Sequence, residues 1–442
     1  MNDKQANKPT PIERLVGPFQ QFAELEAFGG ILLISCTVIA LAWANSPWAA
    51  SYDHLWHAKL TFGFANKTFA EPLHFWINDG LMAMFFLLVG LEIKRETLAG
   101  ELASFKKAAL PAAAALGGML VPAAIYALIN RGGPGASGWG VPMATDIAFA
   151  LGIVALLGNR VSTPLRIFLA ALAIADDIGA VLVIAFFYTE TISAVHLVIA
   201  GLFLLALIAL NRAGARHPLA YAILGIGLWV AFLNSGIHAT VAGVLFAMTI
   251  PARRRIDSRA FLAQSEEILG EFRRAEEGED SIDASAKKSS ALHLLARDCE
   301  RAESPMLRFE HALAPWVSYV IMPVFALANA GVAVGPGIGK KLVDPISLGI
   351  ICGLVLGKPL GIVGFSWLSN RSGLAALPVG ANWRQIDGIG ELAGIGFTMS
   401  LFIADLAFGS TSMLEIAKVG ILAGSIISGV AGEIILLQRT KA

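Results

Sequence analysis

The chain has 442 residues, of which 56% are hydrophobic and 15% are charged, and its mean hydropathy is +0.67. Soluble domains carry roughly 25% charged residues, so this composition excludes a soluble globular protein and predicts a membrane protein with many spans. Basic and acidic residues balance at 33 each, so net charge predicts no nucleic-acid partner. Three widely spaced cysteines form no metal-binding pattern, and no cofactor is expected.

Hydropathy and helix-breaking residues predict an all-α polytopic protein with about twelve transmembrane helices in a lipid bilayer. The predicted spans are 27–45, 75–93, 108–129, 140–158, 164–188, 194–211, 218–234, 237–251, 312–334, 345–368, 388–408 and 414–437. An even number of spans places both termini on one side, and the bias of Lys and Arg identifies that side as the cytoplasm. The chain then divides into a cytoplasmic tail at 1–26, spans one to eight at 27–251, a charged cytoplasmic insertion at 252–309, spans nine to twelve at 310–437 and a cytoplasmic tail at 438–442.

Two stretches outside the spans have patterns of their own. Residues 59–71 alternate around Asn66-Lys67, which predicts a small β-hairpin on the outer face. Its free edge could pair with a second protomer, although an ordinary ordered loop fits the pattern equally well. In the insertion, Phe261, Ile268 and Phe272 recur at helical spacing, and Arg253-Arg254-Arg255 suits anchoring at anionic headgroups. A solvated appendage and a regulatory element are both open interpretations.

Asp176 and Asp177 stand near the middle of Leu169 to Tyr188, an apolar stretch of about the ~20 residues needed to cross a bilayer. A charged carboxylate at that depth costs roughly 2.5–3.5 kcal/mol even on the most lenient scale. Two adjacent carboxylates also disfavour each other's ionisation. A turn or helix cap in a soluble protein fits such a long apolar flank poorly, so the pair predicts a polar function inside the membrane.

Polar or irregular chain also occurs in two other spans. The fourth span contains Val141-Pro142-Met143-Ala144-Thr145-Asp146, and in the eleventh span Gly388, Gly390, Gly394 and Gly396 precede Phe397-Thr398-Met399-Ser400. Broken helices at corresponding positions of two halves are typical of a transporter site. Glycine-rich packing faces are the alternative interpretation of the second case.

Lys358 lies in an apolar part of the tenth span, where it must pair with an acid or lose its proton. The alternative is that its side chain reaches the membrane interface. With Asp146, Asp176 and Asp177 it forms an interior set of carboxylates and one amine. Hard cations prefer oxygen ligands, and protons compete for the same carboxylates. A site that holds either a cation or protons, but not both, couples the transport of the cation to that of protons when its access alternates between the two sides of the membrane. Asp146 is placed to offset the partial positive charge at the N-termini of broken helices. Lys358 is placed to offset the partial negative charge at their C-termini.

Several motifs together resemble NhaA-type sodium/proton antiporters, in the same order from about residue 24 to 437. They are W-I-N-D-G-L-M-A-M-F-F-L-L-V-G-L-E-I-K-R-E (76–96), A-T-D-I-A-F-A-L-G (144–152), A-L-A-I-A-D-D-I-G-A (171–180), S-G-I-H-A-T-V-A-G-V (235–244), G-K-P-L-G-I (357–362) and G-I-G-F-T-M-S (394–400).

The resemblance implies a fold of inverted-topology repeats in which two unwound helices, the fourth and eleventh spans, cross near the membrane midplane; this family is an established example of such a repeat. It implies that Asp176 and Asp177 bind the transported Na+ or H+, and that Lys358 pairs with Asp176 in one state of the transporter. Thr145 and Asp146, with Gly394 and Gly396, would serve the crossing. Because neighbouring residues on a helix point about 100° apart, Asp177 is expected to bind the cation and Asp176 to pair with Lys358.

The implied activity is secondary active transport and not an enzymatic reaction: electrogenic exchange of cytoplasmic Na+ or Li+ for external H+ across a bacterial inner membrane. The resemblance also implies a homodimer formed through residues 59–71. Six residues match positions that the family uses to respond to pH, namely Glu92, Arg95, Glu96, His238, Glu310 and His311. Surface ion pairs along a helix, and for His238 an ordinary structural histidine, remain alternatives.

The chain departs from the family pattern in three respects. The insertion is longer than in the best-known members, Ala314 stands where a further histidine could follow His311, and Glu391 and Asp405 are additional acids in or beside the eleventh span. The longer insertion and Ala314 leave open the pH at which transport is activated. The extra acids could widen a funnel or lie at the interface.

Three other functions are weighed against antiport. Sodium-coupled symport of an organic anion would need a larger polar pocket with fewer carboxylates. An intramembrane aspartyl protease would need a G-x-G-D motif, and none surrounds Asp146, Asp176 or Asp177. In a cation channel, Lys358 would repel the permeating cations.

Overall fold

The computed structural model describes residues 27–64, 67–189, 191–214, 218–252, 258–276, 282–335, 337–409 and 411–438. The predicted N-terminal tail at 1–26, the end of the C-terminal tail at 439–442, the hairpin turn at 65–66, the Arg253–Arg255 run and the acidic linker at 277–281 lie outside these residues.

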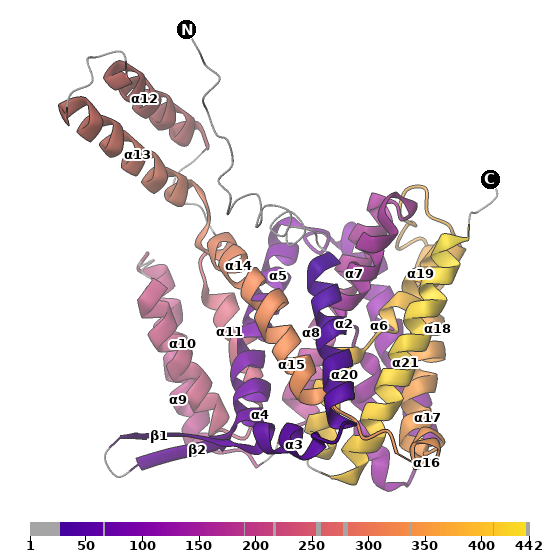
Figure 1. The fold of residues 1–442 in the computed structure, drawn as a ribbon. Coiled ribbons are helices and arrows are strands. Elements are labelled where there is room, and N and C mark those ends of the chain that lie inside the picture. The colour runs from indigo at the N-terminus through magenta and orange to yellow at the C-terminus, as the bar shows by residue number, and fades with distance from the viewer. Residues whose placement is uncertain are drawn as a thin grey trace.

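The structure is helical apart from one two-stranded sheet (Figure 1). The first half contains α2 (Ala27–Ala44), α3 (Ala49–His57), α4 (Leu73–Phe75), α5 (Met82–Ala99), α6 (Phe105–Ile129), α7 (Ile147–Leu157), α8 (Thr163–Phe187), α9 (Ala194–Arg212), α10 (Pro218–Leu233) and α11 (Thr240–Thr249). The second half contains α12 (Ser258–Glu276), α13 (Ile282–Ala302), α14 (Pro305–Trp316), α15 (Met322–Asn329), α16 (Ile338–Leu342), α17 (Pro345–Cys352), α18 (Lys358–Arg371), α19 (Trp383–Ala393), α20 (Phe397–Phe408) and α21 (Ser412–Leu437).

Eight helices in the described part of the chain are long and apolar enough to cross a membrane. Two bent pairs, α2 with α3 and α19 with α20, raise the number to ten if each pair is one span, and α10 and α11 are shorter apolar helices. The polytopic helical fold is therefore confirmed, whereas the number twelve stays a prediction. Several boundaries differ by a few residues: the second span ends at Ala99 instead of 93, and the fourth begins at Pro134 instead of 140. The ninth span begins at Pro305 instead of 312, because Ser304 caps α14 by accepting a hydrogen bond from Leu307 N.

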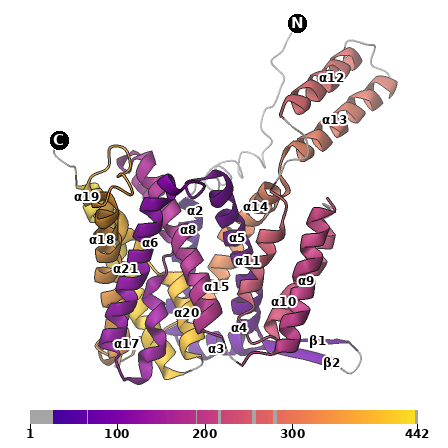
Figure 2. The same cartoon turned by 180° about the vertical axis from the view of Figure 1, so that it is seen from behind.

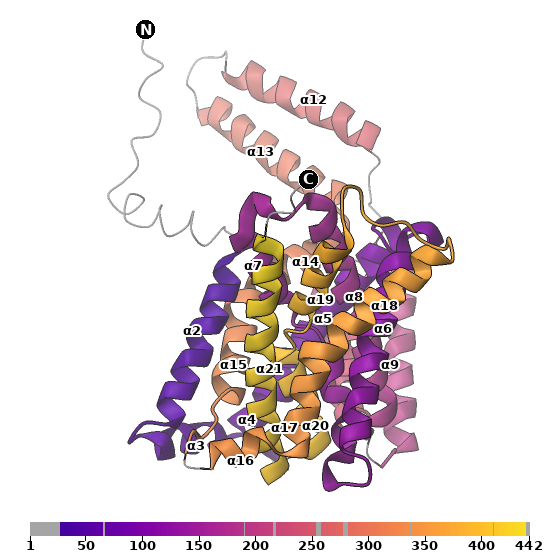
Figure 3. The ribbon, with the colours of Figure 1, turned by 90° about the vertical axis from the view of Figure 1, so that its right-hand side faces the viewer.

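The predicted hairpin forms from β1 (Lys59–Phe64) and β2 (Lys67–Pro72), which pair antiparallel with Lys59 opposite Pro72 and Phe64 opposite Lys67. It projects sideways from one end of the bundle (Figure 1). The insertion forms α12 and α13, which pack against each other and extend from the opposite end (Figures 1 and 3). We call these two ends the hairpin face and the insertion face.

The spanning helices form two groups. The panel consists of α2, α5, α9, α10, α11, α14 and α15, and the site bundle of α6, α7, α8 and α17 to α21. Figure 2 shows α9 and α10 at one edge of the molecule and α17, α18 and α21 at the other. Within the site bundle, α6 and α18 cross closely at Gly117 and Gly361. The helices are so near there that a side chain at Gly117 would meet the Gly361 carbonyl at 2.1 Å. This close crossing carries the start of α18, including Lys358, into the interior.

Candidate ion-binding site

Two helices of the site bundle are interrupted at the same place. A 3-10 segment, Pro134–Met143, leads into extended Ala144 and then α7, while α19 ends at Ala393 and α20 begins at Phe397 after a bend of 47°. The backbone N–H of Asp146 donates to the Ile395 carbonyl oxygen at 2.7 Å. The two interrupted helices therefore meet through a main-chain hydrogen bond where both are unwound (Figure 3 shows α7, α19 and α20).

Asp146 serves the N-termini of both half-helices. One carboxylate oxygen accepts from Phe149 N at 3.0 Å, capping α7, and the other accepts from Thr398 N at 3.0 Å and from the Thr398 hydroxyl. Asp146 is 1% exposed. Helix N-termini carry partial positive charge and unpaired N–H groups, so a buried carboxylate at this point offsets both. This is the contact expected for Asp146.

Gly394 and Gly396 lie where neighbouring segments approach the break in the eleventh span closely. A side chain at Gly394 would lie 2.5 Å from the Leu354 carbonyl oxygen, and one at Gly396 would meet Ser400 Oγ at 2.2 Å and the Ala144 carbonyl at 3.1 Å. Leu354 belongs to the tenth span, so Gly394 allows that span to pack closely on the break, whereas Gly396 faces Ala144 of the fourth span. The glycine pattern of the eleventh span therefore serves helix packing at Gly394 and the crossing at Gly396.

Lys358 reaches the crossing from α18 and is completely buried. Its amino group donates to Asp176 Oδ2 and, at 2.9 Å, to Thr145 Oγ1. The Thr145 hydroxyl lies 2.6 Å from Asp176 Oδ2 and 2.9 Å from the carbonyl oxygen of Ala393, the last residue of α19. Lys358 therefore approaches a helix C-terminus as expected, but through Thr145 and not by direct contact with the carbonyl.

Asp177 lies beside this cluster on α8 and is also 1% exposed. Its Oδ2 atom and Oδ1 of Asp176 are buried and accept no hydrogen bond from the described residues. Buried carboxylate oxygens without donors are costly, and they are the ligand atoms that hard cations prefer. A cation or a proton would satisfy them. The arrangement can hold either species, with the amine of Lys358 fixing one side of the pair.

The pH-response candidates divide between the two faces. Near the insertion face, Arg95 on α5 forms ion pairs with Glu310 on α14 and, at 3.4 Å, with Glu96. Glu92 lies one turn earlier on α5 and is partly buried.

The two candidate histidines lie outside this group. His311 is 71% exposed and pairs instead with Glu303 at 3.2 Å. His238 lies at the hairpin face, 3.5 Å from Asp79. The structure thus assembles only part of the predicted cluster.

Sequence reasoning missed two sets of residues. Thr398 supplies two donors to Asp146, and its position directly after the glycine-rich break could have identified it. Asn78 and Asn329 are buried partners 251 positions apart, and no pattern in the sequence connects them.

Buried acids and an amine at two crossing, interrupted helices define a membrane protein of the secondary-transporter class. The family described as Na+/H+ antiporter 1 matches residues 20–436. Curated relatives named Na(+)/H(+) antiporter NhaA include one from Koribacter versatilis, 50% identical over 99% of this chain and 95% of the relative. Another, from Oleidesulfovibrio alaskensis, is 51% identical over 97% of this chain and 95% of the relative. The chain belongs to the Na+/H+ antiporter 1 family.

Proposed function

We propose that this protein is an electrogenic secondary transporter that exchanges cytoplasmic Na+ or Li+ for external H+ by alternating access. The observation that carries the proposal is the pair of buried carboxylates with unpartnered oxygens beside Lys358, at the point where two interrupted helices cross. The names of relatives of nearly full length support Na+ and H+ as the exchanged ions.

We assign the site residues as follows. Asp177 is the principal ligand of the transported cation, and Asp176 exchanges between the cation and Lys358. Thr145, Asp146, Gly394 and Gly396 hold the crossing. Cation and protons compete for the carboxylates, so one flow drives the other. We also assign a response to pH to Glu92, Arg95, Glu96, His238, Glu310 and His311.

The membrane placement follows from the charge bias of the loops. The insertion face is cytoplasmic, both termini lie on that side, and the protein resides in a bacterial inner membrane with its spans at 27–251 and 310–437. The insertion at 252–309 is a cytoplasmic appendage. Its two ends are tied together by a hydrogen bond from Met306 N to the Pro251 carbonyl oxygen at 3.1 Å, which supports its treatment as a separate unit.

The exchange is testable in everted membrane vesicles that contain a pH-sensitive dye. Once respiration has acidified the vesicle interior, addition of Na+ should release protons and restore the fluorescence, and Li+ should do the same. Vesicles from cells without the protein are the control. No fluorescence recovery with either ion, while the protein is present in the vesicles, would contradict antiport.

We further propose that two copies pair through the hairpin of residues 59–71. The hairpin extends away from its own bundle (Figure 1), and a two-stranded sheet has free backbone groups along both edges. Replacing residues 60–70 by a short Gly-Ser linker is expected to halve the mass measured by light scattering in detergent, while transport in vesicles continues. An unchanged mass would show that the dimer contact lies elsewhere.

A further inference from the structure

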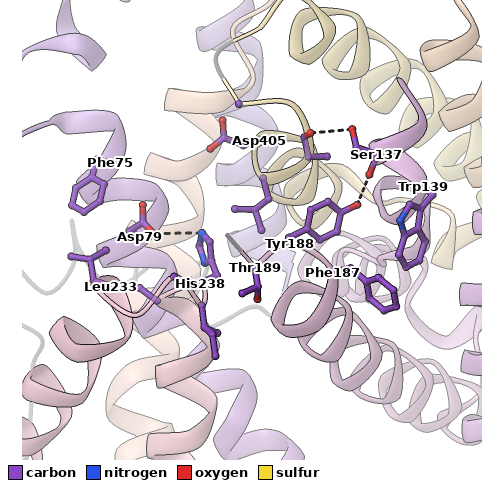
Figure 4. Close-up of a pocket in the computed structure, with 16 residues that line it drawn as sticks. Phe75, Asp79, Ser137, Trp139, Phe187, Tyr188, Thr189, Leu233, His238 and Asp405 are labelled. Atoms are coloured by element: carbon purple, nitrogen blue, oxygen red, sulfur yellow. Dashed lines mark hydrogen bonds and ion pairs between the residues drawn. The ribbon is translucent and has the colours of Figure 1, made fainter. Parts of the chain in front are cut away.

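A cavity of about 650 Å³ opens at the hairpin face between the panel and the site bundle. Figure 4 shows Asp79 and His238 on one side of the cavity, Tyr188 and Trp139 on the other, and Asp405 above them. Asp79 and His238 belong to segments next to the panel, whereas the opposite wall comes from the ends of α8 and α20 and from the 3-10 segment. The cavity thus marks a seam between the two groups of helices.

A chain of hydrogen bonds crosses this seam. Asn78 Nδ2 donates to Asp405 Oδ2 at 2.8 Å, and Asn329 Nδ2 donates to Asn78 Oδ1 at 2.9 Å. His74 Nε2 lies 3.0 Å from Asn329 Oδ1. Asn78 is 4% and Asn329 1% exposed. His74 and Asn78 precede α5 and Asn329 ends α15, so Asp405 is the member that comes from the site bundle.

An aromatic layer lies on the inner side of this chain. Phe402, one turn before Asp405 on α20, packs against Phe86 of α5, with ring centroids 5.5 Å apart, and against Phe325 of α15 at 6.4 Å. All three are at most 1% exposed. Phe402 also packs edge-on to His238 in the cavity wall. The Asp405 chain and this buried aromatic layer together join the panel and the site bundle beside the cavity.

We propose that Asp405, Asn78 and Asn329 form a latch that holds the hairpin face closed between the panel and the site bundle, and that the latch opens each time the ion site faces that side. This inference rests on the proposed alternating access. Hydrogen bonds to a carboxylate are roughly twice as strong as neutral ones, and opening exchanges them for bonds to water. The latch therefore biases the closed state by a modest factor and still permits turnover.

Asp405 is a positioning residue in this proposal. From the sequence, Asp405 is expected to widen an ion funnel or to lie at the membrane interface. Among the described residues, no hydrogen bond joins its carboxylate to Asp176 or Asp177. Lys418 on α21, which is 9% exposed, is a basic side chain within electrostatic range of Asp405.

The first readout of the test is a distance across the seam. Spin labels are attached at cysteines replacing Leu55 on α3 and Thr411 before α21, both exposed at the hairpin face. The protein's own Cys36, Cys299 and Cys352 are replaced by alanine. Pulsed dipolar spectroscopy then gives the fraction of molecules with the seam open. Asp405→Ala and Asn78→Ala should each raise the long-distance fraction about fivefold or more.

Asp405→Asn should give a smaller increase, because its amide oxygen still accepts from Asn78 without a charge. It also provides a milder variant should the alanine substitution prevent folding. Asp387→Asn, which removes an acid from α19 in the other half of the same interrupted span, is the matched control and should leave the distances unchanged.

The latch is overturned if Asp405→Ala and Asn78→Ala both keep the parent distance distribution. It is also overturned if only one of them shifts the distribution, since a single hydrogen bond joins the two side chains. Transport in everted vesicles is measured on the same proteins. Unchanged distances with Na+-driven proton release intact would reject the latch alone. Shifted distances in the variants, together with a parent protein that exchanges no ions, would support the latch and reject the antiport.

Discussion

Replacing Asp177 by Asn is expected to raise the Na+ concentration needed for half-maximal fluorescence recovery in everted vesicles by about 100-fold or more. The substitution keeps the size of the side chain but removes its charge. Leaving a buried ion without its partner costs about 3 kcal/mol or more, which corresponds to two decades in affinity. The loss should appear as a steep rise in the Na+ concentration needed for half-maximal recovery.

The control for this experiment is Asp387→Asn, which removes a carboxylate from the same bundle away from the crossing and should exchange ions as the parent does. Both variants must reach the membrane in equal amounts, as measured by immunoblotting. Full recovery in Asp177→Asn at the parent's Na+ concentration would show that the cation binds elsewhere.

Replacing Lys358 by Ala is expected to lower the thermal stability of the purified protein and to change the pH dependence of transport. Lys358 is the buried cationic partner of Asp176. Removing one member of a buried ion pair costs about 3–5 kcal/mol when the other stays charged. Protonation of Asp176 would relieve part of that cost, so the competition between protons and Na+ at the pair must differ from that in the parent.

A second substitution separates this explanation from a simple packing defect. In the double variant Lys358→Ala/Asp176→Asn no charge is left without a partner, so the melting temperature in detergent should recover most of the loss. A double variant that melts as low as Lys358→Ala would mean that the cavity, and not the unpaired carboxylate, causes the instability. A parent-like pH profile of Lys358→Ala would refute its role as charge partner.

Much of the site could be predicted from the sequence because charged residues inside apolar spans are energetically conspicuous. Asp176, Asp177 and Lys358 stand out for that reason, and the structure brings the Lys358 and Asp176 side chains into contact. The glycines at 394 and 396 indicate a break, and the backbone of α19 and α20 bends there. Repeated apolar residues likewise predict the amphipathic helices of the insertion.

The remaining features depend on tertiary contacts that one-dimensional patterns do not contain. Asn78 and Asn329 lie near span ends, where amides are unremarkable, and their pairing depends on how α15 packs beside Trp76–Leu81, the segment before α5. Glu310 and His311 form one predicted group because they are neighbours in sequence. Adjacent helical residues point about 100° apart, so Glu310 faces Arg95 while His311 faces solvent.

The hydrogen bond between the Asp146 N–H and the Ile395 carbonyl has a consequence for how sequences of this fold can vary. Both atoms are main-chain atoms, so the bond survives exchange of either side chain. Among the twenty amino acids only proline at 146 would remove the donor. The main-chain hydrogen bond between the two interrupted helices is thus retained through most substitutions. Selection at these positions therefore acts on the carboxylate of Asp146 and on the space around the crossing.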